Sequence, residues 1–178
     1  MSISLSYIVF ISILGILFSL WAQFRIKKAP GGDQKMEEIS RAIEEGSRAY
    51  LSRQYKIVSV AAAIIALTLF YFFGVLSATG FLLGAFTSAL AGYLGMATAV
   101  KANVKVSQAA KKGLSDAFNL AYTGGSVTGF LVVSLALLVV SGFWFLTGDL
   151  EALVSLGFGG SLISVFARLG GGIYTKGA

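Results

Sequence analysis

The chain has 178 residues, of which 56% are hydrophobic and only 12% are charged, whereas about a quarter of a soluble globular domain is charged. It has no cysteine and no histidine, which excludes a disulfide framework, a zinc site of the usual kind, and thiol or imidazole catalysis. The net charge of +6 does not indicate nucleic-acid binding, because the basic residues flank apolar runs instead of forming one patch. Long apolar runs in a weakly charged chain predict an all-α, polytopic membrane protein.

The first apolar run covers residues 3–24. No charge precedes it, and Arg25, Lys27 and Lys28 follow it. A signal peptide has a basic start and a shorter apolar region, so this run is predicted to be a permanent span. The basic residues behind it place its N-terminus outside the cell.

A turn and a polar helix are predicted next. The turn is APGGD, and its Asp33 is the expected N-cap of the helix. Apolar or small residues recur on one face at Met36, Ile39, Ile43, Gly46 and Tyr50. Glu37–Arg41 and Glu44–Arg48 are pairs four residues apart with the acid first, which is the favourable order. The stretch is interpreted as a solvated helix that continues into a second span at residues 57–76.

Three further spans are predicted at residues 80–100, 126–146 and 150–167. The break before the third span is expected at SATG, residues 77–80, and the turn before the fifth at TGDLE, residues 147–151. The segment between the third and fourth spans is predicted to be a helix that extends beyond the bilayer and breaks near Gly113.

Small residues recur every fourth position in the third span and at the start of the fourth. They are Gly80, Gly84, Ser88 and Gly92, and then Gly125 and Gly129. Such stripes let the backbone of another helix approach closely, so these helices are expected to pack in a bundle. In a structure of this chain, the glycine faces of the third and fourth spans are expected to be unpartnered or covered by another chain.

The distribution of charge predicts the membrane topology. All fourteen Lys and Arg residues lie in three segments, 25–56, 101–123 and 168–178, and the outer turns carry only Asp149 and Glu151. The positive-inside rule makes the three basic segments cytoplasmic. Five spans then put the N-terminus outside and the C-terminus in the cytoplasm, and the lipid bilayer is the first expected partner.

The last residues, FARLGGGIYTKGA, join an apolar segment to Arg168, three glycines and Lys176. A basic, glycine-rich end is a candidate anion site, because glycines let backbone N–H groups approach a phosphate. The spacing does not match a phosphate-binding P-loop, and a helix rather than a strand precedes it. Spacing alone favours Lys176 as an anchor at the membrane interface. For Arg168 it leaves open both a snorkelling side chain and a group in an ion pathway.

The acidic residues are badly placed for metal-dependent hydrolysis, which needs clustered acids around divalent ions. Five of the eight lie between Asp33 and Glu45, Asp116 stands alone, and Asp149 and Glu151 are on the outer side. None neighbours Lys176 in the sequence. The sequence therefore predicts no catalytic residue and no metal ligand within this chain.

Four stretches carry a family resemblance: MEEISRAIEEGSRAYLSRQYK, GYLGMATAVKANVKVSQAAKKG, AFNLAYTGGSVTGF and FARLGGGIYTK. The last is similar to the pattern F-x-R-x-G-G-G-x-[YF]-T-K and is the most specific. In order along the chain, they resemble segments of the membrane-integral, ion-pumping inorganic pyrophosphatases. The alternative is a small, non-enzymatic five-span membrane protein or transporter subunit whose glycine stripes only pack helices.

The resemblance implies a homodimer with about sixteen spans in each subunit, of which this chain is the N-terminal portion. Its members hydrolyse magnesium pyrophosphate on the cytoplasmic side and move protons or sodium ions outward, here in a prokaryotic inner membrane. Mg²⁺ is the implied cofactor. Pyrophosphate, the remaining helices and a second subunit are the implied partners, with no nucleic acid.

The resemblance also implies roles for residues near the end of the chain. By position in the motif, Lys176 binds pyrophosphate and Arg168 belongs to a charged coupling gate. Gly170, Gly171 and Gly172 allow close helix packing near the site. In the family, an acid-rich stretch follows the motif and supplies the metal ligands, so the isolated chain is expected to be inactive. The residues that set ion choice and K⁺ dependence are expected outside this chain.

Overall fold

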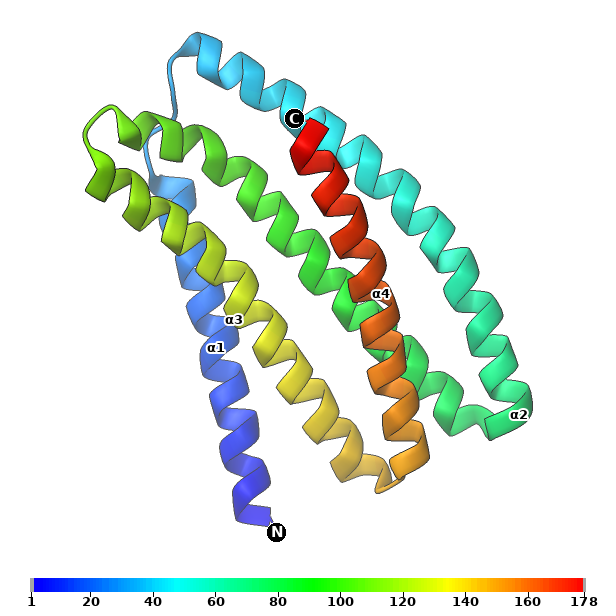
Figure 1. The fold of residues 1–178 in the computed structure, drawn as a ribbon. Coiled ribbons are helices and arrows are strands. Elements are labelled where there is room, and N and C mark those ends of the chain that lie inside the picture. The colour runs from blue at the N-terminus through cyan, green and yellow to red at the C-terminus, as the bar shows by residue number, and fades with distance from the viewer. Residues whose placement is uncertain (1, 178) are drawn as a thin grey trace.

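The structure is a computed structural model that describes residues 2–177, with the side chains of residues 5–166. These residues form four helices and no strand: α1 (Ser2–Lys28), α2 (Gln34–Ala110), α3 (Leu114–Thr147) and α4 (Leu150–Gly177) (Figure 1). The all-α class predicted from the sequence is confirmed. The predicted break near Gly113 and the predicted turn before residue 150 are confirmed as well.

Helix α2 is a hairpin with two arms, residues 34–73 and 75–110, which run in opposite directions (Figure 1). The bend is at Gly74, whose backbone angles of φ 83° and ψ 179° are essentially accessible only to glycine. The predicted break at residues 77–80 was wrong by a few residues. Gly80 stays helical there and is buried against α4, so Gly74 is the glycine that makes the turn. The five expected spans therefore correspond to four helices, because the second and third expected spans are the two arms of α2.

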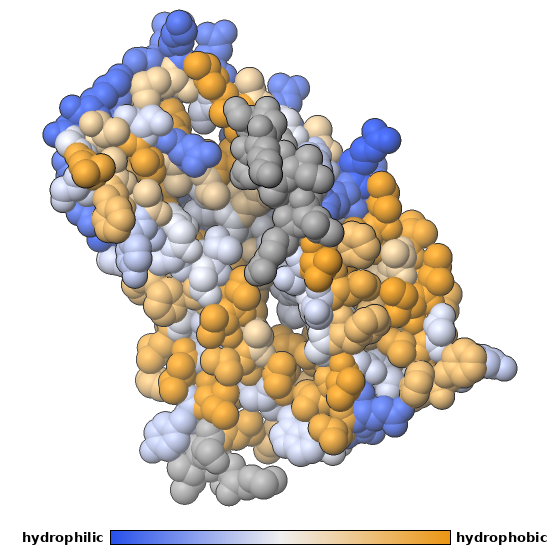
Figure 2. Space-filling model, in the orientation of Figure 1, coloured by the Kyte–Doolittle hydropathy of each residue, from blue (hydrophilic) through white to orange (hydrophobic). Residues whose placement is uncertain are grey.

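The helices have the length and composition of membrane spans. Within the described residues, α1 from Leu5, α2 and α3 are each long and apolar enough to cross a bilayer, and Leu150–Phe166 of α4 is a shorter apolar helix. Figure 2 shows hydrophobic residues over the middle of the molecule, most hydrophilic residues toward one end and a smaller hydrophilic group at the other end. Large apolar side chains such as Leu67 are mostly exposed, which suits contact with lipid.

The N-cap predicted at the start of α2 is confirmed. Asp33 is the N-cap, and its Oδ1 accepts a hydrogen bond of 3.0 Å from the Met36 amide. Its Oδ2 lies 2.9 Å from Nζ of Lys111, the residue that follows the second arm of the hairpin. These two contacts, the Met36 amide first, hold the pKa of the Asp33 carboxyl below its usual value. The hairpin is thereby closed at its polar end.

Two predicted ion pairs on the first arm of α2 are confirmed. Arg41 lies 3.7 Å from Glu37, and Arg48 lies 2.7 Å from Glu44. The predicted apolar face was wrong by about one residue, because Ile39 is 55% exposed whereas Ser47 is 3% and Leu51 7% exposed.

Helix α4 packs onto both arms of α2. One buried cluster joins Val58 of the first arm, Ala85 of the second arm and Ile163 of α4. On the other side of the bundle, α1 packs on α3, where Ala22 and Ile26 of α1 meet α3 and the second arm of α2. This arrangement seats α4, which carries the candidate site residues, on the α2 hairpin.

The contact between α4 and the second arm of α2 is backbone to backbone. A Cβ added at Gly80 would lie 2.6 Å from Ala152 O, and one at Gly84 would lie 2.0 Å from Leu156 O. A Cβ added at Gly159 of α4 would lie 2.1 Å from Phe81 O. The expectation that this stripe is unpartnered was therefore wrong at Gly80 and Gly84, which α4 of the same chain covers, whereas Ser88 and Gly92 line an open groove. At Gly125 and Gly129 an added Cβ meets nothing within 4 Å, as expected for the fourth span.

Candidate functional site

Helix α4 is the element that carries the candidate site residues. It begins after Gly148, which has left-handed backbone angles and whose amide donates to Trp144 O at 2.8 Å. Asp149 caps the new helix by accepting a hydrogen bond of 3.0 Å from the Ala152 amide. The backbone then stays helical through the three glycines to Gly177.

The structure places the predicted site residues on one helix. Arg168 and Lys176 are eight positions apart, which corresponds to a rise of about 12 Å along a helix. Gly170, Gly171 and Gly172 lie between them on the same helical backbone. The side chains of these residues lie outside the described side chains, so the roles of Lys176 and Arg168 stay predictions.

A side-chain hydrogen bond ties α4 to the first arm of α2 just before the glycine motif. Gln54 Nε2 donates to the backbone oxygen of Phe166, two residues before Arg168. One residue along α2, Tyr55 Oη donates to Ala89 O at 3.0 Å and joins the two arms. The segment that leads into the motif is thus held against the hairpin by groups that no pattern in the sequence singles out.

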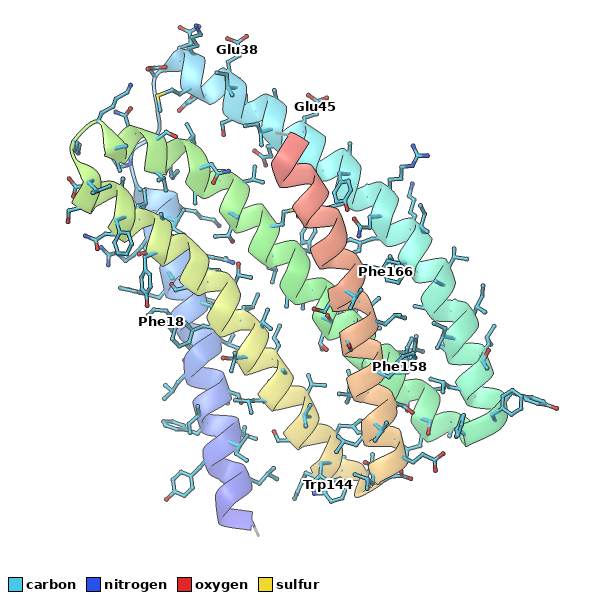
Figure 3. The ribbon with its side chains drawn as sticks, viewed as in Figure 1. Phe18, Glu38, Glu45, Trp144, Phe158 and Phe166 are labelled. Atoms are coloured by element: carbon cyan, nitrogen blue, oxygen red, sulfur yellow. The ribbon has the colours of Figure 1, made fainter. Side chains whose placement is uncertain are left out.

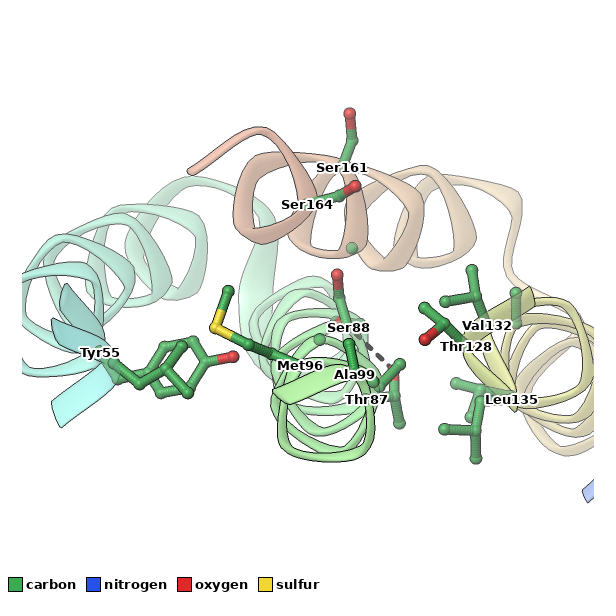
Figure 4. Close-up of a pocket in the computed structure, with 18 of the residues that line it drawn as sticks. Tyr55, Thr87, Ser88, Met96, Ala99, Thr128, Val132, Leu135, Ser161 and Ser164 are labelled. Atoms are coloured by element: carbon green, nitrogen blue, oxygen red, sulfur yellow. Dashed lines mark hydrogen bonds between the residues drawn. The ribbon is translucent and has the colours of Figure 1, made fainter. Parts of the chain in front are cut away.

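A groove with a volume of about 1000 Å³ opens between both arms of α2, α3 and α4 (Figure 4). Its wall includes Tyr55, Ser88, Met96, Thr128, Leu135 and Ser164, and no charged residue lines it among the described side chains. The hydroxyl of Thr87 donates within its own helix, to Leu83 O at 2.9 Å and Gly84 O at 3.1 Å. A wall of this kind suits helix packing and offers no cation to a polyanionic ligand.

The described residues do not fit a bound divalent metal ion. No group of three or more Asp, Glu, His or Cys residues gathers among the side chains of residues 5–166. Glu37 and Glu44 are engaged with arginines, and Asp33 with Lys111. Glu38 and Glu45 point away from the other helices (Figure 3). Metal-dependent chemistry therefore cannot be derived from these side chains.

Lys105 makes the most elaborate polar contact in the described part of the chain. Its Nζ donates to three backbone oxygens at and just after the end of α1: Ile26 at 2.7 Å, Lys27 at 2.7 Å and Ala29 at 3.0 Å. Carbonyls in the last turn of a helix lack intrahelical partners and favour a nearby cation. Burial lowers the pKa of the Lys105 ammonium, which lies outside the apolar run 80–100. No local pattern in the sequence singles out Lys105, because its partners lie 76–79 residues away.

Comparisons with known proteins agree on one family. A family model described as inorganic H⁺ pyrophosphatase matches residues 13–178. A "K(+)-insensitive pyrophosphate-energized proton pump" of Methanosarcina mazei is 45% identical over 168 residues, which cover 93% of this chain and 25% of that protein. A similarly named pump of Moorella thermoacetica is 39% identical over 178 residues, covering 93% of this chain and 26% of that protein.

One relative is named for a different ion. A "Putative K(+)-stimulated pyrophosphate-energized sodium pump" of Clostridium tetani is 36% identical over 173 residues, which cover 97% of this chain and 26% of that protein. The chain spans about a quarter of the length of the curated relatives that it matches.

Proposed function

The chain belongs to the inorganic H⁺ pyrophosphatase family, and we propose that it forms the N-terminal part of a pyrophosphate-energised ion pump. The observation that carries this proposal is the family match over residues 13–178, which includes the glycine motif on α4. The complete pump hydrolyses magnesium pyrophosphate at its cytoplasmic side and uses the energy to move an ion outward. The alternative of a small non-enzymatic membrane protein is less well supported, because the relatives are named as pumps.

The proton is the first candidate for the transported ion. The family description and the relative of 45% identity both name a proton pump. Sodium is the second candidate, because a relative of 36% identity is named as a sodium pump. Mg²⁺ enters with pyrophosphate, and its ligands come from acidic residues that the complete pump supplies elsewhere, because the described side chains do not fit it.

The proposed topology has five crossings: α1, the two arms of α2, α3 and α4. The α1–α2 and α2–α3 connections lie at one end of the bundle, and the Gly74 bend and the α3–α4 turn lie at the other (Figure 1). The connections at the first end carry the basic residues, which supports a cytoplasmic location for residues 25–56, 101–123 and 168–178. The N-terminus is then outside a prokaryotic inner membrane.

Lys176 binds pyrophosphate, and Arg168, two turns earlier on α4, belongs to the coupling gate. The unbroken helix and the Gln54–Phe166 hydrogen bond support these roles, because they fix the direction in which α4 enters the motif. Gly170, Gly171 and Gly172 leave room for another helix to approach. The remaining helices of the pump cover the uncharged groove, and a second subunit completes a homodimer.

The test uses inverted membrane vesicles that contain the complete pump carrying this sequence. Phosphate release and ion uptake are measured in the same vesicles. Lys176→Ala should lower both, because a lost charge-assisted contact is worth on the order of 1.5–3 kcal/mol, roughly ten- to a hundredfold. Lys112→Ala, which removes the same charge from an exposed position at the end of the hairpin, serves as the control.

Arg168→Ala should behave differently, with ion uptake lost more completely than phosphate release. Strictly proportional loss of both activities, or no loss of either, would contradict a gate role. An unchanged apparent affinity and rate for Lys176→Ala would leave that lysine as a membrane anchor only. The purified 178-residue chain should release no phosphate from magnesium pyrophosphate, and measurable release would show that its own carboxylates can hold the metal.

A further inference from the structure

A second, smaller cavity lies at the polar end of the bundle, between the end of α1 and both arms of α2. Its volume is about 250 Å³. The polar side chains around it are Lys27, Glu37, Ser40, Arg41, Lys101 and Lys105. The volume falls just below the roughly 300–1,000 Å³ of sites for drug-sized ligands, so it suits a fragment as small as a headgroup.

The charge around this cavity is strongly unbalanced, with four cations and one carboxylate. Glu37 lies 3.7 Å from Arg41, which offsets part of that arginine's charge. Lys105 has all three N–H groups directed to carbonyls at the end of α1, so it adds charge but no donor. Lys27 and Lys101 are exposed and have no ion-pair partner among the described side chains, so their ammonium groups can reach an anion.

The two unpaired lysines, Lys27 and Lys101, indicate the level at which the cavity lies in the membrane. Lys27 follows the apolar run 3–24, and Lys101 follows the apolar run 80–100, so both lie in the first turn outside the hydrocarbon region. Neighbouring side chains of α1 mark the same level: the Arg25 guanidinium lies 5.2 Å from the centre of the Trp21 ring. Trp21 is half exposed, and exposed tryptophan is typical of the membrane–water interface.

We propose that this cavity binds the phosphate group of an anionic phospholipid. Basic pockets between membrane helices at this level hold lipid headgroups, and each nearby lysine or arginine strengthens the attraction. Any phosphate ester or free phosphate shares the required chemistry. The lipid is the favoured source, because the cavity opens where headgroups are concentrated and apolar helix surface begins within one turn. The inference needs only a membrane-embedded chain and is independent of pump activity.

The test is native mass spectrometry of the full-length protein carrying this sequence, purified in a neutral detergent and titrated with phosphatidylglycerol or phosphatidylcholine. Lys27→Gln combined with Lys101→Gln removes the two lysine charges that have no ion-pair partner among the described side chains. Lys28→Gln combined with Lys112→Gln is the matched control, because it removes two lysines at the same end of the bundle that do not line the cavity. Far-UV circular dichroism of both variants reports folding.

The unmodified protein should retain phosphatidylglycerol in preference to phosphatidylcholine. The first pair of substitutions should weaken phosphatidylglycerol binding by about fivefold for each lysine, or about 25-fold together, and the control pair by less than about twofold. Lys27→Arg with Lys101→Arg keeps both charges and should retain binding, which separates loss of the site from loss of the fold.

Three results would overturn the proposal. Equal weakening by the two glutamine pairs would mean that only overall surface charge attracts the lipid. No weakening by either pair would remove the cavity as a site. Displacement of phosphatidylglycerol by submillimolar inorganic phosphate or pyrophosphate would make the cavity a site for a soluble anion. Failure of the vesicle assays of pump activity would leave the lipid result unaffected.

Discussion

Two glycine stripes with the same spacing have opposite surroundings in this molecule. Gly80 and Gly84 lie against the backbone of α4, at distances that leave no room for a methyl group. Gly125 and Gly129 on α3 are exposed, and a Cβ at either position meets no described atom within 4 Å. A four-residue spacing of glycines therefore indicates a surface that another helix can approach, and the presence of the partner depends on the rest of the fold.

The difference comes from the helices that the rest of the chain supplies to each stripe. Helix α4 brings its own small residues to the α2 stripe, and Gly159 approaches Phe81 O as closely as Gly84 approaches Leu156 O. The contact is thus reciprocal, with glycine on both helices. Within the described part of the chain, no helix offers the α3 stripe a comparable face. In the proposed pump, that stripe is available to helices beyond this chain.

Gly84→Ala should have the largest effect on stability. The new Cβ would lie 2.0 Å from Leu156 O, and a backbone oxygen cannot move without shifting the whole of α4. We expect a loss of about 3 kcal/mol in the free energy of unfolding, at the upper end of overpacking effects. Denaturant titration in detergent micelles, followed by circular dichroism, measures it. A change below about 0.5 kcal/mol would mean that α4 is not seated on this stripe.

Gly15→Ala on α1 should have a smaller, rescuable effect. The new Cβ would lie 2.0 Å from Ser134 Oγ on α3, but here the obstacle is the end of a side chain. We expect a loss of about 1–2 kcal/mol, and Ser134→Ala should recover most of it. A double-mutant cycle in micelles measures the coupling. Additive losses would contradict the contact, and no change on Ser134 can rescue Gly84→Ala.

Gly129→Ala should have the smallest effect and the opposite sign. Alanine favours a helix over glycine by about 0.5–1 kcal/mol, and nothing in the described structure blocks its Cβ. The 178-residue chain should become slightly more stable in micelles. In the complete pump the same substitution should be destabilising, because a helix of the remaining pump then covers the stripe. A gain of stability in both forms would show that the α3 stripe faces lipid.

Features set by neighbouring residues were predicted well from the sequence. The Asp33 cap, the Glu37–Arg41 and Glu44–Arg48 pairs, and the breaks near Gly113 and Gly148 each depend on a few consecutive residues. Their physical causes are therefore visible in the sequence itself.

Features set by distant residues were missed or misplaced. The bend at Gly74 could not be distinguished from one at Gly80, because the use of Gly80 in packing depends on α4, some 70 residues later in the chain. The triple contact of Lys105 and the Gln54–Phe166 bond have no local signature either. The candidate roles of Lys176 and Arg168 came from a motif, and the helical path of α4 through that motif is what the structure adds.

The contact of Lys105 has a consequence for how the protein is made. The lysine is 79 residues later in the chain than Ile26, whose carbonyl it binds. At synthesis rates of about 5–20 residues per second, it leaves the ribosome's active centre about 4–16 s after that carbonyl. During this interval the three carbonyls at the end of α1 lack their lysine partner. The end of the first helix therefore gains this contact only after most of the α2 hairpin has been synthesised.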